Sequence, residues 1–262
     1  MKGKKIKIAG VLLVSTMLAV TSLAACGTKT TNKSTGSSGS TTTVSASDMF
    51  TKRDLDSGYD ESKATKIKLS DSKTTVSGDG AKFSSENGVN TVTITKEGTY
   101  ILSGKLNGQV VVDTDKTAKV QIVLKGATVS GKSTAAIYVK QADKVFLTLA
   151  PNSENTLTET GEFASDNSST VDGVIFSKDD LSINGTGLLK ISTESGHGVV
   201  SKDDLVIASG TIEIKSSGHG LQGKDSVRIA GGTITINSSN DGIHSENKDD
   251  SKLGFVYIKG GT

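Results

Sequence analysis

The sequence predicts an all-β protein that folds as a parallel β-helix, and three observations support this class. The string "SKDDL" at 177–181 returns at 201–205, and the variant "GKDSV" follows at 223–227. Between these strings, apolar and polar residues alternate with the period of two that is typical of β-strands. The chain is also rich in Gly, Ser, Thr, Val and Ile, with one Pro, no Trp and 4% aromatic residues, which favours short strands and tight turns.

Four aligned segments define the repeat. They begin at residues 172, 197, 219 and 241, and the middle two are 22 residues long. The fourth contains an insertion near "ENKDDSK" and matches again at "FVYIKGGT". Self-similarity at a fixed period predicts a solenoid, and a coil of about 22 residues suits a parallel β-helix. A leucine-rich repeat has a similar length but needs a Leu/Asn pattern, which this chain lacks.

The alternation assigns side chains to the two sides of each strand. The predicted inward-facing residues are Leu205, Ile207, Ile212, Ile214, Val227, Ile229, Ile234 and Ile236. The predicted outward-facing residues are Asp204, Val206, Thr211, Glu213, Arg228, Thr233 and Thr235. Upstream, the segments 90–104, 109–131 and 135–157 predict earlier, less regular coils, and 156–171 predicts a longer loop.

The first 61 residues are predicted to lie outside the β-helix, which then spans 62–262. Residues 1–25 have the basic start and apolar stretch of a signal peptide, and "LAAC" at 23–26 resembles a lipobox that would place a lipid on Cys26. A Gly/Ser/Thr-rich stretch follows, so we expect 26–61 to be a lipid anchor and flexible tether. An uncleaved N-terminal anchor is the alternative. Both readings attach the domain to the extracellular face of a cell membrane.

Net charge gives no indication of nucleic-acid binding. The chain has 30 basic and 28 acidic residues, and removal of the four signal-peptide lysines leaves 26 against 28. No nucleic-acid partner is therefore expected. Cys26 is the single cysteine, so disulfides are not expected to stabilise the fold.

Residues that repeat in register stack about 4.8 Å apart along a β-helix and form rows on its surface. Three rows follow from the repeated strings: Lys178, Lys202 and Lys224; Asp179, Asp203 and Asp225; and Asp180, Asp204 and Ser226. A fourth row opens the units and contains Asp172, His197, His219 and Asp241.

Stacked carboxylates repel one another, and a bound calcium ion would relieve the repulsion. Calcium takes six to eight oxygen ligands at roughly 2.3–2.6 Å, which two coils with backbone carbonyls and waters can supply. The candidate ligands are Asp172, Asp179, Asp180, Asp203, Asp204, Asp225 and Asp241, with Glu246, Asp249 and Asp250 from the insertion. The alternative is a solvated turn in which Asp accepts from backbone N–H groups and Lys neutralises it.

Two further chemistries remain open at these rows. His197 and His219 with Asp241 would suit a transition metal, although a residue between two glycines is more often part of a turn. His244 lies two residues past the matching glycine and is expected to stay outside this row.

A calcium-dependent lyase is the second open chemistry. It would use Lys202, Lys224 or Arg228 as the base that removes a proton next to a uronate carboxylate. Repetition on every coil is instead typical of a structural residue. With Lys178, these three residues are also the predicted polysaccharide contacts.

The run from "GTYILSGKLNG" to "KVFLTL", with "FSKDDLSINGTG" and "GKDSVRIAGGTITI", resembles a family of bacterial secreted carbohydrate-binding proteins over about 62–262. The resemblance implies a right-handed β-helix similar to polysaccharide lyases, with bound Ca²⁺ near the repeated aspartates. It also implies binding of cellulose and acidic plant sugars without firmly established lyase activity. Family members often open each coil with Asp-Gly, and the His-Gly pairs at 197 and 219 depart from that pattern.

The side-chain inventory favours an acidic polysaccharide over crystalline cellulose. Trp is absent, and Tyr257 would present a single outward ring. We therefore expect a lipid-anchored protein that binds pectin-like, and less readily cellulosic, polysaccharide with calcium. A calcium-dependent pectate lyase and a structural or adhesive stalk are the alternatives. Because "YIKGGT" stops short of a second strand, further coils are expected beyond residue 262.

Overall fold

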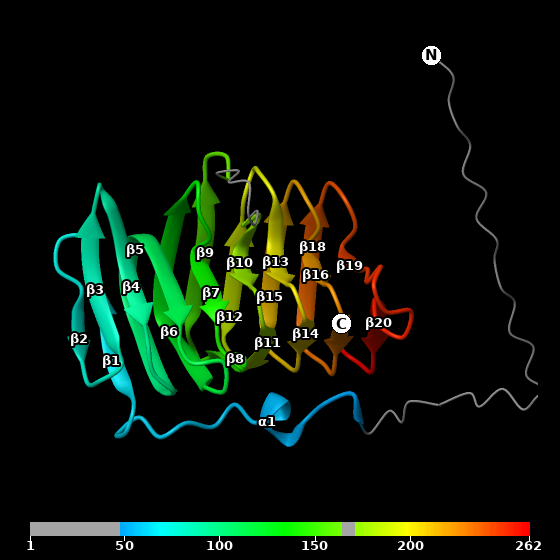
Figure 1. Ribbon diagram of the computed structural model, residues 1–262, viewed down its shortest axis with the longest axis horizontal. Helices are drawn as coiled ribbons and strands as arrows, with labels where there is room; N and C mark the ends of the chain where they lie inside the picture. The colour runs from blue at the N-terminus through cyan, green and yellow to red at the C-terminus, as the bar shows by residue number, and fades with distance from the viewer. Residues whose placement is uncertain (1–47, 164–170) are drawn as a thin grey trace, which may run out of the picture. The chain divides into compact units, whose positions relative to one another are not determined.

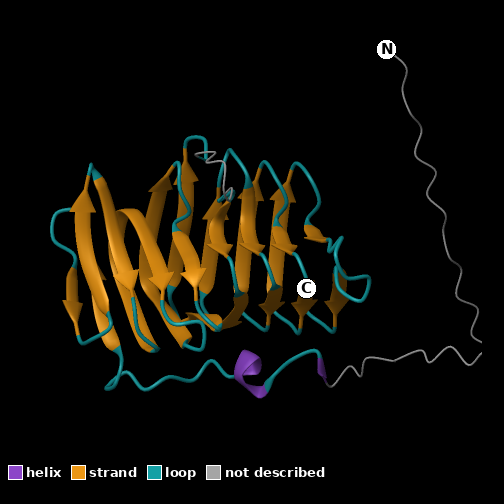
Figure 2. Ribbon diagram, viewed as in Figure 1, coloured by secondary structure: helices purple, strands orange, loops and turns teal. Residues whose placement is uncertain are grey.

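Short strands stack coil upon coil, as the repeat predicts (Figure 1). The computed structural model describes residues 48–163 and 171–262. Strands make up nearly all of the regular structure in this part of the chain (Figure 2). Strands of successive coils pair in parallel along three faces, so the predicted parallel β-helix is confirmed.

Each face is a ladder of parallel strands from successive coils, and faces 1 and 2 each begin at the N-terminal end with one antiparallel pair. Face 1 contains β3 (Ala81–Glu86), β4 (Val89–Ile94), the end of β5 (Gly98–Asp113), β7 (Ile137–Gln141), β10 (Gly173–Ser177), β13 (His197–Ser201), β16 (Leu221–Gly223) and β19 (Ile243–Ser245). Face 2 contains β2 (Thr75–Ser77), β1 (Thr65–Leu69), the start of β5, the start of β6 (Lys119–Lys132), β8 (Lys144–Leu149), β11 (Asp180–Gly185), β14 (Asp204–Ile207), β17 (Ser226–Ile229) and β20 (Phe255–Ile258). Face 3 contains the middle of β5, the end of β6, β9 (Glu154–Thr160), β12 (Leu188–Ser192), β15 (Thr211–Ser216) and β18 (Thr233–Ser238).

The register matches the sequence repeat in the C-terminal coils. Leu205 pairs with Val227, 22 residues further along the chain. Leu181 pairs with Leu205 at a spacing of 24 residues. Val227 pairs with Val256 at a spacing of 29, because the insertion lengthens that coil. Upstream, β9 continues to Thr160, so the predicted loop at 156–171 begins later than expected.

The core lies inside the coils and consists of the apolar side of every strand. All eight predicted inward residues are confirmed: six are buried, and Ile234 and Ile236 are partly buried against them. Full burial of such a side chain stabilises the fold by about 1.5–3 kcal/mol. The coil is tight where "HG" recurs, since a Cβ added at Gly220 would lie 2.4 Å from Ile236 Cγ2. Packing therefore requires the glycine after each of these histidines.

The segment 48–61, called here the N-terminal strap, covers the outer side of face 2. It contains the single-turn helix α1 (Lys52–Leu55), which begins with a capping box between Thr51 and Asp54. Arg228 Nη1 donates to the carbonyl of Met49 at 3.0 Å, and Asn184 Nδ2 donates to the carbonyl of Asp54 at 3.1 Å. The strap therefore belongs to the folded unit, and the prediction that 26–61 is a tether is wrong for residues 48–61.

The strap also changes the environment of the outward-facing residues of face 2. Val206, predicted to face outward, is fully buried at 0% exposure. It lies between Ser182 and Arg228 in the row that the strap covers. Face 2 is therefore buried on both sides at β8, β11 and β14, as parallel sheets usually are.

The predicted signal peptide and Cys26 lie outside the described residues. Within the described residues, no helix has the length and apolar character needed to span a bilayer.

Candidate functional site

The repeated "SKDD" strings form the corner between faces 1 and 2, called here the acidic corner (178–180, 202–204 and 224–225). Ser177 closes the first turn: its hydroxyl donates to the carbonyl of Asp179 at 2.6 Å and accepts from the amide of Asp179 at 3.2 Å. Each turn also stacks on the turn of the previous coil, since the amide of Lys202 donates to the carbonyl of Ser177 at 2.9 Å. The repeat thus places its carboxylates in rows along one edge of the β-helix.

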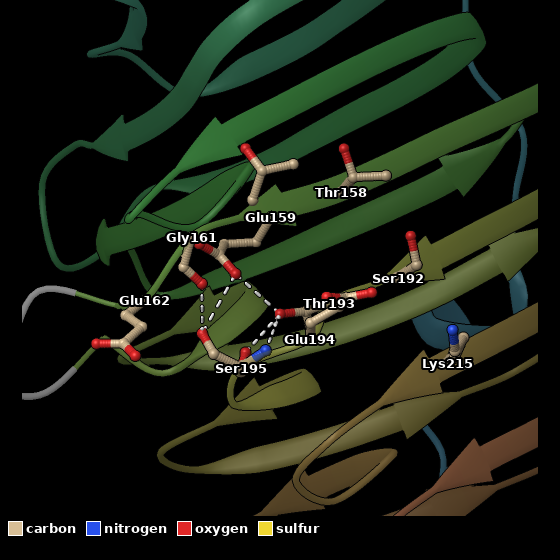
Figure 3. A pocket seen from close by; sticks show the side chains of 10 residues that line it. Thr158, Glu159, Gly161, Glu162, Ser192, Thr193, Glu194, Ser195 and Lys215 are labelled. Carbon is tan, nitrogen blue, oxygen red and sulfur yellow. Dashed lines mark hydrogen bonds between the residues drawn. The ribbon is translucent and has the colours of Figure 1, made fainter.

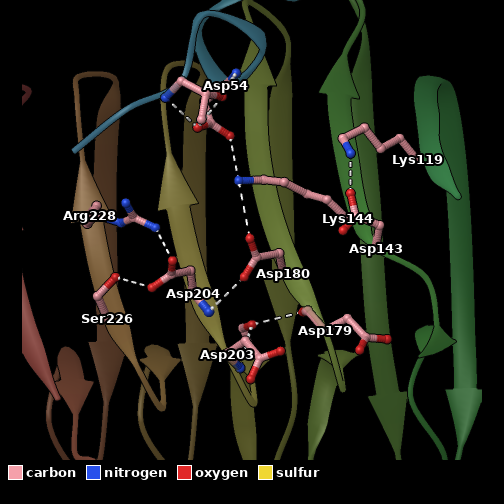
Figure 4. Close-up of polar contacts among 12 residues, drawn as sticks. Asp54, Lys119, Asp143, Lys144, Asp179, Asp180, Asp203, Asp204, Ser226 and Arg228 are labelled. Carbon is pink, nitrogen blue, oxygen red and sulfur yellow. Dashed lines mark hydrogen bonds and ion pairs between the residues drawn. The ribbon is translucent and has the colours of Figure 1, made fainter. Parts of the chain in front are cut away.

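The inner row, Asp180 and Asp204, is neutralised by cations (Figure 4). Lys144 Nζ lies 3.7 Å from Asp180 Oδ2, and Arg228 forms an ion pair with Asp204. Ser226 adds a hydrogen bond to Asp204 Oδ1 at 2.6 Å. Burial still raises the pKa of Asp180 above its ordinary value, although the Lys144 charge opposes the shift.

Lys144 also links this row to the N-terminal strap, a contact that the sequence analysis did not find. Its ammonium lies 2.8 Å from Asp54 Oδ1, and the two side chains are only 10% and 2% exposed. Burial alone would raise the pKa of Asp54, but the hydrogen bond and charge of Lys144 lower it overall. The only sequence signal was a lone lysine at the start of an otherwise apolar strand.

The outer row consists of Asp179, Asp203 and Asp225, and one of its carboxylates, that of Asp203, has no hydrogen-bond donor or cation beside it in the described part of the chain. Asp179 Oδ2 accepts from the amide of Ala142 at 2.9 Å, and Asp225 Oδ1 accepts from Asn247 Nδ2 at 2.6 Å. Among the described residues, no side chain or amide donates to the carboxylate of Asp203. Burial, and then repulsion from Asp180, Asp225 and the other aspartates of the corner, raise the pKa of Asp203 to about 6.

The lysines of the corner point elsewhere. Lys178 Nζ lies over the ring of Tyr138 at 6.0 Å, and Lys202 Nζ lies over the ring of Phe176 at 5.1 Å. Lys224 forms an ion pair with Asp249 at 3.0 Å. Arg228 is bound to Asp204 beneath the strap. These cations therefore leave Asp203 without a close positive partner.

The remaining predicted ligands are dispersed. Glu246 lies 3.5 Å from Lys248, and Asp250 accepts from the amide of Lys252 at 2.9 Å. Neither contacts the outer row in the described part of the chain. The insertion contacts the acidic corner through Asn247, which the sequence analysis did not select, and through Asp249, which pairs with Lys224.

Asp172 and Asp241 lie at another corner, between faces 3 and 1, with the histidines. His197 pairs in register with Gly173, one residue later than predicted, although its amide still donates to the carbonyl of Asp172 at 2.7 Å. The prediction that His244 stays outside this row holds for its backbone, which pairs with Gln222, but its ring stacks on that of His219, with centroids 4.2 Å apart. Its place on β19 brings the ring back over the preceding coil.

The same corner, nearer the middle of the β-helix, holds a polar cavity of about 620 Å³ (Figure 3). Glu159 is only 3% exposed at its base, where Oε2 accepts from the hydroxyl of Thr193 at 2.8 Å and Oε1 accepts from the amide of Ser133 at 3.2 Å. Thr158, Ser192 and Lys215 line its face 3 side. The sequence analysis did not find this cavity, because its walls come from three coils that do not share a motif.

The outer surface of face 3 continues the lining of this cavity from coil to coil. Paired residues form one row of polar side chains, all of them short except Lys215: Asn107, Ser130, Thr158, Ser192, Lys215 and Asn237. Hydroxyl and amide groups lie on nearly every coil of this row.

Fold and surface together define a class, a parallel β-helix that carries polar and charged side chains in rows on its outside. The profile of the carbohydrate-binding domain-containing protein family matches residues 88–262, and the chain belongs to this family.

One member and one solved structure show how far the similarity extends. A carbohydrate-binding domain-containing protein from Acetivibrio thermocellus is 45% identical over 174 residues, which cover 65% of this chain and 61% of that protein. The chain therefore spans less than two thirds of that relative. The polysaccharide lyase-like protein from C. thermocellum, solved as a gadolinium derivative, has a TM-score of 0.71 and 35% identity over 76% of this chain and 80% of that one.

Proposed function

We propose that the chain is a non-catalytic polysaccharide-binding protein that holds acidic polysaccharide at the acidic corner through bound calcium. The family and the lyase-like structural relative support polysaccharide as the ligand class. The lipobox at Cys26 supports attachment to the extracellular face of the cell membrane.

The observation that carries the calcium proposal is the uncompensated carboxylate of Asp203. Burial and repulsion from the neighbouring aspartates raise its pKa to about 6, and a bound cation would relieve that repulsion. Asp179 and Asp225 lie on the neighbouring coils of the same row, and we expect the side chain of one of them to turn toward Asp203 and add further oxygens to the same ion. A hard cation with oxygen ligands fits this donor set, with backbone carbonyls and waters completing the shell.

A calcium ion on an exposed carboxylate row keeps open positions, which the carboxylates of an acidic polysaccharide can occupy. The bound ion would thus link the carboxylates of the acidic corner to those of a pectin-like ligand.

The row of polar side chains on face 3 is the surface that we assign to uncharged sugar units. Sugar hydroxyls form hydrogen bonds with Ser, Thr and Asn side chains, and the coil spacing of about 4.8 Å is comparable to the length of one sugar ring. The aromatic platforms typical of cellulose binding do not occur on this row. Cellulose is therefore the weaker of the two predicted ligands.

The lyase alternative needs an unprotonated base, and the candidates are engaged elsewhere. Arg228 is paired with Asp204, and Asp249 raises the pKa of Lys224 above its ordinary value through a hydrogen bond and its charge. Lys202 is the remaining candidate.

Incubation with polygalacturonate and calcium tests the lyase directly, by the absorbance of unsaturated product. We expect none. Product that disappears in Lys202→Ala would show that the chain is a lyase.

Binding is tested by retention of the chain on insoluble pectin, with calcium and with a chelator. We expect calcium-dependent retention that Asp203→Asn weakens by more than about tenfold, equivalent to the loss of roughly 1.4 kcal/mol. Asp115→Asn, an exposed carboxylate in the turn after β5, is the matched control and should bind normally. Absence of retention on every pectin and glucan tested would favour the structural stalk.

A further inference from the structure

Three metal-ligating side chains meet at the corner between faces 3 and 1 in the last coils. His219 precedes β16, Asp241 precedes β19, and His244 lies within β19. In the described part of the chain they form one group of three whose ligand atoms all lie within 4.8 Å of one another. The carboxylates of the acidic corner do not form such a group, so this is a separate site with a different donor set.

The distances between donor atoms suit a small metal ion. Asp241 Oδ2 lies 3.4 Å from His219 Nδ1 and 3.0 Å from His244 Nδ1. Zinc binds imidazole nitrogen and carboxylate oxygen at about 2.0–2.2 Å, so two ligands around a tetrahedral centre lie roughly 3.3 Å apart. One ion can therefore contact all three atoms once the ring of His244 turns out of its stack with His219.

The hydrogen bonds at the site are ones that a metal can replace. The amide of Asp241 donates to His219 Nδ1 at 3.2 Å, a long hydrogen bond. In the tautomer that carries its proton on Nδ1, His244 donates a hydrogen bond to Asp241 Oδ2 at 3.0 Å. When an ion binds, that proton moves to the other ring nitrogen of His244, and both Nδ1 lone pairs become available to the metal.

The neighbouring coil lacks this arrangement, although it has the same residue types. His197 Nδ1 accepts from the amide of His219 at 2.8 Å, a shorter hydrogen bond. Its Nε2 lies 3.8 Å from Asp172 Oδ2, and no second histidine among the described residues pairs with that carboxylate. His197 therefore stacks on the group without belonging to it, with its ring centroid 5.1 Å from that of His219.

We propose that His219, Asp241 and His244 bind a divalent transition-metal ion, with zinc as the best match. Two imidazoles and one carboxylate are a donor set that selects zinc, nickel or copper over calcium. The side chain of Asp241 is 63% exposed, so the remaining coordination position faces solvent. That position takes water, or an oxygen of a bound ligand.

Two properties of the rings bear on metal binding near neutral pH. Burial, and then the charge of His244, lower the pKa of His219, so a proton competes less with the metal there. The rings of His219 and His244 are inclined by only 13°, whereas a metal lies in the plane of each ring that it binds. Binding therefore tilts His244 out of the stack.

Calorimetric titration of the full chain with zinc, after dialysis against a chelator, tests the proposal. We expect one zinc per chain, no displacement by excess calcium, and cobalt absorption bands typical of nitrogen and oxygen ligands. His219→Ala and His244→Ala should each weaken binding by more than about tenfold. His197→Ala removes a ring of the stack but no ligand, and it should bind zinc normally.

Thermal melting without metal checks that each variant is folded. Asp241→Asn, at an exposed position, keeps the shape of the side chain and provides a second test if a histidine variant unfolds. Zinc binding that is absent in the wild type, or unchanged in Asp241→Asn and His244→Ala, would overturn the proposal. Asp203→Asn should retain zinc binding, so failure at the acidic corner and failure at this site are distinguishable.

Discussion

Asp203→Asn should stabilise the protein when calcium is absent, which is unusual for a partly buried residue. The folded state raises the pKa of this carboxyl from 3.8 to about 6, so the folded state favours the protonated form. As pH rises from about 4 to 6, the unfolded chain loses its proton first, and the free energy of unfolding falls. The neutral amide removes that loss.

The size of the effect follows from the shift. About 1.4 kcal/mol per pKa unit gives about 3 kcal/mol for a shift from 3.8 to about 6. The side chain is partly exposed, and solvent and salt screen the repulsion, so about 1–1.5 kcal/mol is the expected gain at pH 7.5. For a domain of this size, that raises the melting temperature by about 2–6 °C.

Thermal and urea unfolding at pH 4 and pH 7.5, in a chelator, measure this gain. We expect no difference between wild type and Asp203→Asn at pH 4, and a more stable variant at pH 7.5. Calcium should stabilise the wild type and have little effect on the variant. A variant that is less stable than the wild type at pH 7.5 in chelator would refute the reasoning, because the carboxylate would then have a favourable partner in the fold.

Three further predictions concern the scaffold. Lys144→Met removes the cation beside the buried carboxylate of Asp54 and should cost about 3–5 kcal/mol in urea unfolding at pH 7. Because the folded pKa of Asp54 lies below 3.8, the stability that this pair provides is present above that pH and is lost as pH falls through the folded value. Gly220→Ala introduces a Cβ into a packed coil and should cost about 1–3 kcal/mol, whereas Gly231→Ala, whose nearest neighbour would be 3.5 Å away, should cost less. A chain that begins at residue 62 should melt at a lower temperature and become protease-sensitive on face 2.

Each of these has a contrary outcome. A Lys144→Met variant as stable as wild type at pH 7 would mean that water reaches Asp54. Equal losses for Gly220→Ala and Gly231→Ala would remove the packing explanation of the "HG" repeat. Unchanged melting after removal of residues 1–61 would mean that the N-terminal strap contributes no stability.

The fold was predictable because each coil repeats the one before it, shifted by one step along the axis of the β-helix. A strand of constant spacing stacks in register on its predecessor, so the period that aligns Leu205 with Val227 in sequence also pairs them in space. The inward pattern follows from the same period. The acidic corner was predictable for this reason, as a set of rows.

Charge pairing within those rows was not predictable, because it depends on side-chain direction. The lysines next to the aspartates in sequence lie over Tyr138 and Phe176 of face 1. The cations that neutralise the inner row come from other strands. His244 shows the same limit, since its backbone pairs with Gln222 and yet its ring stacks on that of His219.

The sequence by itself determined the β-helix, its coil length, its core and the rows of ligand-type residues, because each depends on spacing along one chain. The tertiary structure alone decided which carboxylate lacks a partner and which histidines meet. It also placed the N-terminal strap across face 2, where Asn184 binds the carbonyl of Asp54 across 130 residues of chain. No local period encodes such a contact, because it arises only when distant surfaces with complementary charge and hydrogen-bonding groups are brought together.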